Sequence, residues 1–166
     1  MGDMRDTPGV IAPPPLLAAA AVVIGLILDR VFPAYVLTIL LSFPQRVTIG
    51  LVLLAAGGAL GFSATRAFRR AGTHAEPWKP SSALVTSDVF RYLRNPMYVG
   101  LVSMLVGFAV LVASDWTMVT TIVFALVLHV GVIKREEHYL EAKFGDEYRS
   151  YRRRVRRYGW PPFGLR

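Results

Sequence analysis

Four long apolar runs dominate the sequence and constrain how the chain can fold. They cover about residues 10–28, 47–68, 97–113 and 116–133. A transmembrane helix needs roughly 17–25 apolar residues, each adding about 1.5 Å of length, so every run can cross a bilayer. In lipid, a helix satisfies all of its backbone polar groups internally. The runs therefore predict an all-α integral membrane protein with about four transmembrane helices and further, cytoplasmic helices near the C-terminus.

A fifth apolar segment, residues 31–43, is shorter than these runs. It contains Pro33 near its start and is followed directly by Pro44. A segment of this length favours an interfacial or re-entrant element over a fifth span. Only Ser114 and Asp115 separate the last two runs, which predicts a tight antiparallel helical hairpin.

The basic residues predict the orientation of the bundle. The chain is 54% hydrophobic and yet has a formal charge of +8. Six Lys and Arg residues lie within 66–96 and ten lie from residue 134 onward. Two helices join these segments, so both lie on one side, and the positive-inside rule makes that side cytoplasmic. We expect an inner- or plasma-membrane protein with both termini and its active site in the cytoplasm.

The same composition excludes several classes of protein. The cations are not interleaved with a soluble fold, which argues against a nucleic-acid-binding protein. There is no cysteine, so disulfides, thiolate metal sites and cysteine nucleophiles are excluded. His74 and Glu76 are too few to bind a metal, so we expect no metal site. The N-terminal residues lack the basic start and cleavage site of a signal peptide, and we expect the first apolar run to be retained.

Two further patterns concern packing. Gly57 and Gly61 form a GxxxG motif, which predicts close helix packing, either within the chain or in a homodimer. Gly145 predicts a break that separates the last membrane helix from a helix over about 147–157. On that second helix Tyr148, Tyr151 and Val155 share one apolar face. Arginines cover the rest of it, so we expect it to lie against anionic membrane lipids.

The polar stretch before the third run is a candidate anion site. Pro96 fits the first turn of a helix, and Asn95 is then the natural N-cap. The positive helix terminus and the charge of Arg94 together favour a carboxylate or a phosphate. Alternatively, Arg91 and Arg94 only mark the cytoplasmic side and extend toward water.

A pair of carboxylates, Glu136 and Glu137, follows the fourth run. Neighbouring residues on a helix point about 100° apart, so we expect at most one of them to face the bundle freely. The alternative role is pairing with nearby arginines. One side of the membrane thus combines an anion site with carboxylates, which matches a zwitterion with an additional positive centre, such as S-adenosylmethionine.

Four short motifs in order resemble the membrane-embedded methyltransferases that include isoprenylcysteine carboxyl methyltransferase and the phospholipid N-methyltransferases. They are L-V-T-S-x-x-F-R-Y at 84–92, R-N-P-M-Y-V-G at 94–100, R-E-E at 135–137 and F-G-D-E-Y-R-S-Y-R-R-R-V at 144–155. The resemblance covers about residues 66–157. Many members have histidine where this chain has Asn95, which can hydrogen-bond but cannot act as a base.

The resemblance implies a cofactor site for S-adenosylmethionine. One side of the site is implied to be Arg94, Asn95, Pro96, Tyr98 and Gly100, with Glu136 and Glu137 opposite and with Tyr148 and Tyr151 closing it. The expected catalytic residues are Glu137, Arg94 and Asn95. The chain is then a single domain, 1–166, in which 1–68 supplies N-terminal helices and 69–158 forms the cofactor-binding core.

The implied reaction is methyl transfer to a lipophilic small molecule or lipid that arrives from the bilayer. The acceptor is a phospholipid amine, or a prenylated or other hydrophobic carboxylate or thiol. An amine acceptor must first lose a proton, for which Glu136, Glu137, His129 and His138 are candidates. The alternative function is a non-catalytic membrane scaffold or a small transporter subunit.

Overall fold

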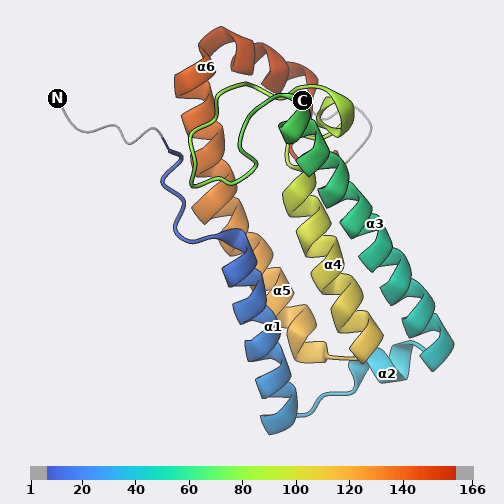
Figure 1. Cartoon of the computed structure of the whole chain (residues 1–166). Helices are drawn as coiled ribbons and strands as arrows, with labels where there is room; N and C mark the ends of the chain where they lie inside the picture. Colours follow the sequence, from blue (N-terminus) through green and yellow to red (C-terminus); the bar gives the residue numbers. More distant parts are fainter. Residues whose placement is uncertain (1–6, 160–166) are drawn as a thin grey trace.

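The structure, a computed structural model, describes residues 7–159 and forms a bundle of long antiparallel helices (Figure 1). Within these residues the elements are α1 (Pro14–Val31), α2 (Val36–Leu40), α3 (Phe43–Arg70), the 3₁₀-helix η1 (Asp88–Arg91), α4 (Pro96–Val112), α5 (Asp115–Leu128), the π-helix η2 (His129–Ile133) and α6 (Lys134–Arg154). Helices α5, η2 and α6 follow one another without a loop, so one long helix runs from the hairpin at Ser114 to the opposite end of the bundle.

The lengths and composition of these helices confirm an all-α membrane protein. Within residues 7–159, three helices are long and apolar enough to cross a membrane, namely α1, α3 and the continuous helix that starts at Asp115. Helix α4 is apolar as well but has 17 residues. Large apolar side chains on the outside of the bundle, such as Leu51 and Leu126, are more than half exposed, as expected for a surface that faces lipid.

Glycines bring α3 and α4 into close contact. A Cβ atom on Gly57 would lie 2.5 Å from the carbonyl oxygen of Gly100, and one on Gly107 would lie 2.9 Å from the carbonyl oxygen of Gly50. Larger side chains would force the two backbones apart, so the small residues permit this approach. The prediction of close packing within the chain is confirmed for Gly57, whereas a Cβ atom on Gly61 would meet no atom within 4 Å. The homodimer stays a prediction.

The segment 31–43 connects α1 to α3 at one end of the bundle and does not span it (Figure 1). Its short helix α2 is held by Asp115, whose carboxylate accepts hydrogen bonds from the N–H groups of Val36 at 2.8 Å and Leu37 at 2.9 Å. Helix α3 begins at Phe43, earlier than the apolar run indicates, because Ser42 at the N-cap and Gln45 in the first turn form a capping box.

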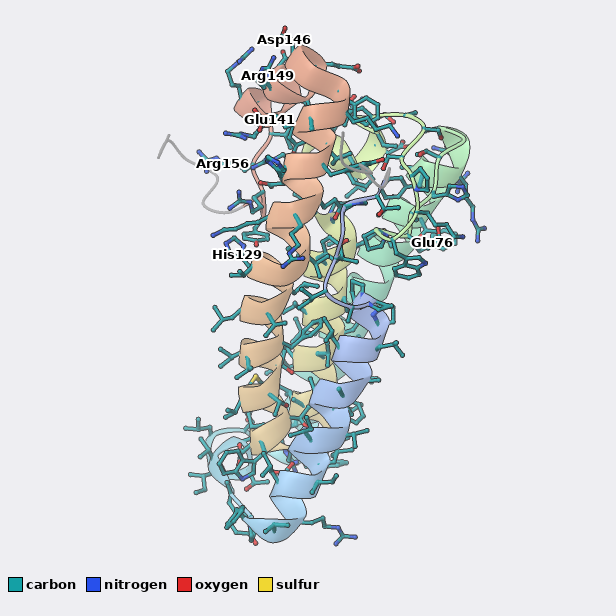
Figure 2. The ribbon with its side chains drawn as sticks, turned by 90° about the vertical axis from the view of Figure 1, so that its left-hand side faces the viewer. Glu76, His129, Glu141, Asp146, Arg149 and Arg156 are labelled. Atoms are coloured by element: carbon teal, nitrogen blue, oxygen red, sulfur yellow. The ribbon has the colours of Figure 1, made fainter. Side chains whose placement is uncertain are left out.

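The two basic segments lie together at the other end of the bundle, as predicted. Figure 2 shows that Glu141, Asp146, Arg149 and Arg156 gather there, while His129 lies lower on the long helix. The loop of residues 71–87 joins α3 to η1 at the same end (Figure 1). We call this region the polar end of the bundle; its cytoplasmic location stays a prediction.

Helix α6 bends at Gly145, where φ is 54° and ψ is −123°, and this confirms the predicted break. The predicted end near residue 157 is wrong, because α6 stops at Arg154. Residues 155–159, which we call the C-terminal strap, instead turn back toward the start of α4. The N–H of Arg94 donates to the carbonyl of Arg156 at 2.8 Å. This pairing with the segment before α4 competes with a continuation of helix α6 beyond Arg154.

Candidate active site

The polar end brings three segments together: the residues before and within the first turn of α4, the first turns of α6, and the C-terminal strap. Pro96 begins α4, as predicted, and orients the chain so that Arg94 and Asn95 precede the helix. The apolar part of the long helix ends at Ile133, so Glu136 and Glu137 follow it on the polar part. The loop 71–87 covers this region.

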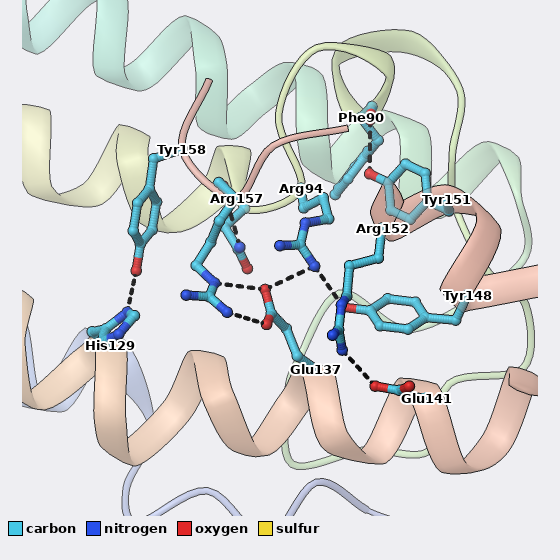
Figure 3. A network of polar contacts seen from close by, with 11 residues as sticks. Phe90, Arg94, His129, Glu137, Glu141, Tyr148, Tyr151, Arg152, Arg157 and Tyr158 are labelled. Atoms are coloured by element: carbon cyan, nitrogen blue, oxygen red, sulfur yellow. Dashed lines mark hydrogen bonds and ion pairs between the residues drawn. The ribbon is translucent and has the colours of Figure 1, made fainter. Parts of the chain in front are cut away.

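Glu137 lies between two arginines, as Figure 3 shows. Its Oε1 is 3.2 Å from Nη1 of Arg94, and both of its oxygens accept hydrogen bonds from Arg157, at 2.9 Å and 2.6 Å. The side chains of Arg94 and Glu137 are only about a tenth exposed. The predicted anion site and the predicted carboxylate therefore bind each other here, and the pairing with arginines holds for Glu137.

This environment keeps Glu137 ionised. Burial alone would raise the pKa of its carboxyl group. The hydrogen bond from Arg157 and the positive charges of Arg94 and Arg157 outweigh burial, so the pKa lies below its ordinary value. Glu137 is thus an anion at neutral pH, and it compensates the charge of the buried Arg94.

Glu136 has a different environment. Its Oε2 accepts a hydrogen bond from the hydroxyl of Tyr98 at 2.8 Å. The pKa of Glu136 is raised to about 7: burial and the charge of Glu137 raise it, and the Tyr98 hydrogen bond partly offsets them. At neutral pH this carboxyl group is therefore poised between its protonated and ionised forms.

Neither glutamate faces the bundle freely, which agrees with the expectation that at most one would do so. Both are engaged, because the roughly 100° between them is matched by two different neighbours. Glu136 reaches Tyr98 on α4, whereas Glu137 reaches Arg94 before α4 and Arg157 on the strap.

Asn95 occupies the N-cap position of α4 but does not cap it with its side chain. Its Nδ2 instead donates to the carbonyl of Arg157 at 3.3 Å. The strap supplies an acceptor that competes with the helix terminus for the Asn95 side chain, and no sequence pattern predicted that contact. Asn95 is buried and acts here as a link between α4 and the strap.

Aromatic residues complete the surroundings of Arg94. The hydroxyl of Tyr148 accepts a hydrogen bond from Arg94 Nη1 at 3.3 Å, and the hydroxyl of Tyr151 donates to the carbonyl of Phe90 at 2.7 Å. The rings of Phe90 and Phe68 pack edge to face with centroids 5.1 Å apart. Tyr148 and Tyr151 are buried, which confirms the predicted apolar face for these two residues, whereas Val155 lies on the strap and not on the helix.

A small cavity of about 40 Å³ lies under the loop 71–87. Its lining includes Arg94, Glu136, Tyr148 and Phe90, together with loop residues such as His74. The Nε of Arg94 is buried and has no hydrogen-bond partner among the residues that the structure describes. A buried donor without an acceptor is costly, so this nitrogen marks a position where a ligand oxygen would be stabilising.

The structure does not bring all of the predicted residues into this site. Gly100 faces Gly57 on α3 and serves helix packing. His129 contacts Tyr158 rather than the cavity, and His138 is exposed. Glu76, by contrast, lies in the covering loop, lines the cavity and forms an ion pair with Lys79 at 2.8 Å.

Arg157 binds Glu137 in the site but was not predicted there, because the last helix was expected to extend through residue 157. The sequence does hold a signal. Gly159 follows Tyr158 and has a positive φ of 69°, and Pro161 and Pro162 follow shortly after it in the sequence, so a helix end is expected in this region. The direction in which the strap turns back is set by its contacts with residues 93–95.

Comparison with known proteins adds an independent observation. Residues 45–147 match the family described as phospholipid methyltransferase. A stretch of 129 residues is 32% identical to a protein-S-isoprenylcysteine O-methyltransferase of Schizosaccharomyces pombe, covering 75% of this chain and 52% of that protein. A stretch of 112 residues is 31% identical to a probable protein-S-isoprenylcysteine O-methyltransferase of Oryza sativa, covering 64% of this chain and 57% of that protein.

A shorter relative, an uncharacterised protein of Haemophilus influenzae, is 42% identical over 62 residues, which cover 37% of this chain and 98% of the relative. The chain spans about half the length of the isoprenylcysteine methyltransferases that it matches. No solved structure was found to match the chain.

Proposed function

Since this chain belongs to the phospholipid methyltransferase family, we propose that it transfers a methyl group from S-adenosylmethionine to a lipophilic acceptor at the polar end of the bundle. One observation carries this proposal. The guanidinium group of Arg94 is nine-tenths buried, its Nε lacks a partner among the described residues, and it lines one cavity with Glu136. That arrangement suits a ligand with both an anionic and a cationic group.

The chemistry of the site fits the cofactor. S-adenosylmethionine carries a carboxylate, an ammonium, sugar hydroxyls and an adenine ring beside its sulfonium. Arg94 would bind the carboxylate, and Glu136 or Glu137 would hold the ammonium or the hydroxyls. The aromatic side chains of Phe90 and Tyr148 offer an apolar surface for the adenine ring. When bound, S-adenosylmethionine supplies a methyl group that its sulfonium already activates.

The protein's own residues then align the acceptor and exclude water. Glu136 is suited to accept a proton from an amine acceptor, because burial places its pKa at about 7, close to physiological pH. The names of the family and of the relatives favour a phospholipid or an isoprenylcysteine-type acceptor. The gathering of basic residues at the polar end supports a cytoplasmic site.

The covering loop has to move for this function. Ligand sites commonly measure roughly 300–1,000 Å³, whereas the cavity under the loop measures about 40 Å³. The loop is tied to α6 by the hydrogen bond that the N–H of Ser81 donates to the hydroxyl of Tyr139 at 3.1 Å. Displacement of the part of the loop that covers the cavity would enlarge the cavity.

A transfer assay tests the proposal. The purified protein in lipid nanodiscs is incubated with methyl-labelled S-adenosylmethionine, a total lipid extract and a farnesylated cysteine derivative, and the products are separated by chromatography. We expect label in a lipophilic product, a loss of it in Glu137→Gln, and near-normal activity in Glu141→Gln, which lies on the same helix. If no labelled product forms in any mixture, the non-catalytic scaffold becomes the better account.

A further inference from the structure

A separate cavity lies between the last turns of α3 and the 3₁₀-helix η1, and we call it the α3–η1 cavity. It measures about 390 Å³. Its lining includes Phe62, Arg66 and Arg70 of α3 together with Asp88, Val89 and Tyr92 in and after η1. The three α3 residues are spaced four apart, so they share one face of the helix. The cavity therefore presents two cations and an aromatic ring on a single helix face.

The α3–η1 cavity lies where lipid head groups meet the protein. Residues 47–62 of α3 contain no charged residue, whereas Arg66, Arg69 and Arg70 follow closely. Phe62 is 67% exposed and thus ends the part of α3 that faces hydrocarbon. Tyr92 is 69% exposed, and tyrosines are typical of the boundary between hydrocarbon and water. The cavity is therefore placed at the depth of phospholipid phosphates.

The positive charge of the α3–η1 cavity is only partly compensated. Arg70 forms an ion pair with Asp88 at 3.2 Å, in which the two side chains are 56% and 42% exposed. Arg66 has no hydrogen-bond or ion-pair partner within residues 7–159. Solvent-exposed ion pairs contribute little to stability, so an anion can share Arg70 with Asp88 at small cost. The cavity thus offers one free guanidinium group and a second one that is weakly held.

The short helix η1 separates the α3–η1 cavity from the candidate active site. A 3₁₀-helix has three residues per turn, so Val89 and Tyr92 lie on one side, and both line the α3–η1 cavity. Phe90 is buried and lines the cavity that contains Arg94. Among the residues that the structure describes, none lines both cavities. A molecule in the α3–η1 cavity is therefore held apart from the site proposed for methyl transfer.

We propose that the α3–η1 cavity binds the head group of an anionic phospholipid, with its phosphate between Arg66 and Arg70 and an acyl chain along Phe62. Guanidinium groups bind phosphate strongly through paired hydrogen bonds. Basic pockets at this depth attract anionic lipids. This lipid is not the methyl acceptor, because η1 lies between it and the active site. The inference goes beyond the proposed function and does not depend on it.

Lipid binding by the detergent-solubilised protein tests the inference. Native mass spectrometry with increasing phosphatidylglycerol should reveal one lipid that is bound more tightly than any other. We expect Arg66→Gln to weaken its binding about fivefold, because one basic residue at the membrane surface is lost. The matched control Arg69→Gln removes the same charge from an exposed residue of α3 outside the cavity lining, and it should leave the affinity unchanged. Equal losses in the two variants would overturn the site, because general attraction to a basic surface would then explain them.

Two further ligands define what the cavity recognises. Phosphatidylcholine has no net charge, so it should bind more weakly than phosphatidylglycerol; equal affinities would overturn the assignment to an anionic lipid. Inorganic phosphate at equal concentration should not displace phosphatidylglycerol, because it has no acyl chain to contact Phe62. Displacement would assign the cavity to a soluble anion and overturn the lipid assignment.

Hydrogen–deuterium exchange in nanodiscs supplies a second readout. The lipid would contact Asp88, Val89 and Tyr92, so the N–H groups of residues 88–92 should exchange more slowly in phosphatidylglycerol than in phosphatidylcholine. This difference should vanish in Arg66→Gln and persist in Arg69→Gln. Equal exchange of the unmodified protein in both lipids would contradict binding against η1. None of these measurements involves S-adenosylmethionine, so a failure of this site is distinguishable from a failure of the proposed function.

Discussion

Arg157 holds Glu137 with two hydrogen bonds, at 2.9 Å and 2.6 Å, although twenty residues separate them in the chain. This contact closes the C-terminal strap against the first turns of α6. The strap is fixed at its other side by Asn95, which donates to the carbonyl of Arg157. The carboxylate that a cofactor would use is therefore also the anchor of the segment that covers it.

Arg157→Ala should loosen the C-terminal strap. Hydrogen bonds to charged groups contribute about 1.5–3 kcal/mol, and the partial exposure of Arg157 brings the expected loss of stability to the low end of that range. Hydrogen–deuterium exchange should accelerate at residues 155–159 and at the N–H of Arg94. The control Arg153→Ala removes an exposed arginine of the same helix end and should leave exchange unchanged; equal protection in both variants would show that the contact does not hold the strap.

Gly57→Ala should separate α3 from α4. The new methyl group would lie 2.5 Å from the carbonyl oxygen of Gly100, a backbone atom that cannot move alone. Overpacking of this kind costs about 1–3 kcal/mol. Thermal unfolding in detergent should show a lower midpoint for Gly57→Ala than for Gly58→Ala, whose methyl group meets no atom within 4 Å. Equal midpoints would contradict the glycine-mediated packing.

Glu136 should titrate near neutral pH. Its pKa is about 7 in the folded protein and lower when the chain is unfolded, so the free energy of unfolding falls as the pH rises from about 4.5 to 7. The carbonyl stretch of the protonated carboxyl group, followed by infrared spectroscopy, should disappear around pH 7 and be absent in Glu136→Gln. Tyr98→Phe removes a hydrogen bond that lowers this pKa, so it should move the transition to higher pH. A transition near pH 4.5 in the unmodified protein would refute the burial of Glu136.

The loop 71–87 should respond to the cofactor. Because the cavity beneath it measures about 40 Å³, binding of S-adenosylhomocysteine requires the loop to move. Hydrogen–deuterium exchange of the loop should therefore change on binding, while exchange in the α1–α5 contact should stay the same. Binding without any change in the loop would place the ligand elsewhere.

The sequence was sufficient for those parts of the fold that depend on local composition. The apolar runs predicted the long helices, and the basic residues predicted that residues 66–94 and 134–157 share one end. Pro96 predicted the start of α4, and Gly145 predicted the bend in α6. Each of these features follows from hydropathy or from the backbone preference of one residue.

The sequence was insufficient where contacts between distant segments decide the outcome. The side chain of Asn95 was expected to cap α4, but the carbonyl of Arg157, 62 residues away in the sequence, attracts it instead. Whether Glu136 and Glu137 both find partners depends on where α4 begins relative to α6, which no local pattern in the sequence determines. The π-helix at His129 has no composition that distinguishes it from the apolar α-helix before it.

The most direct test of the account is the affinity of the detergent-solubilised protein for S-adenosylhomocysteine, measured by isothermal titration calorimetry. Arg94→Lys keeps the charge but removes the unpaired Nε, whereas Arg91→Lys makes the same change at an exposed residue. We predict binding by the unmodified protein, at least a tenfold weaker affinity for Arg94→Lys, or about 1.4 kcal/mol, and no change for Arg91→Lys. No binding by the unmodified protein, or equal affinities for the two variants, would contradict the assignment of Arg94 to a cofactor site.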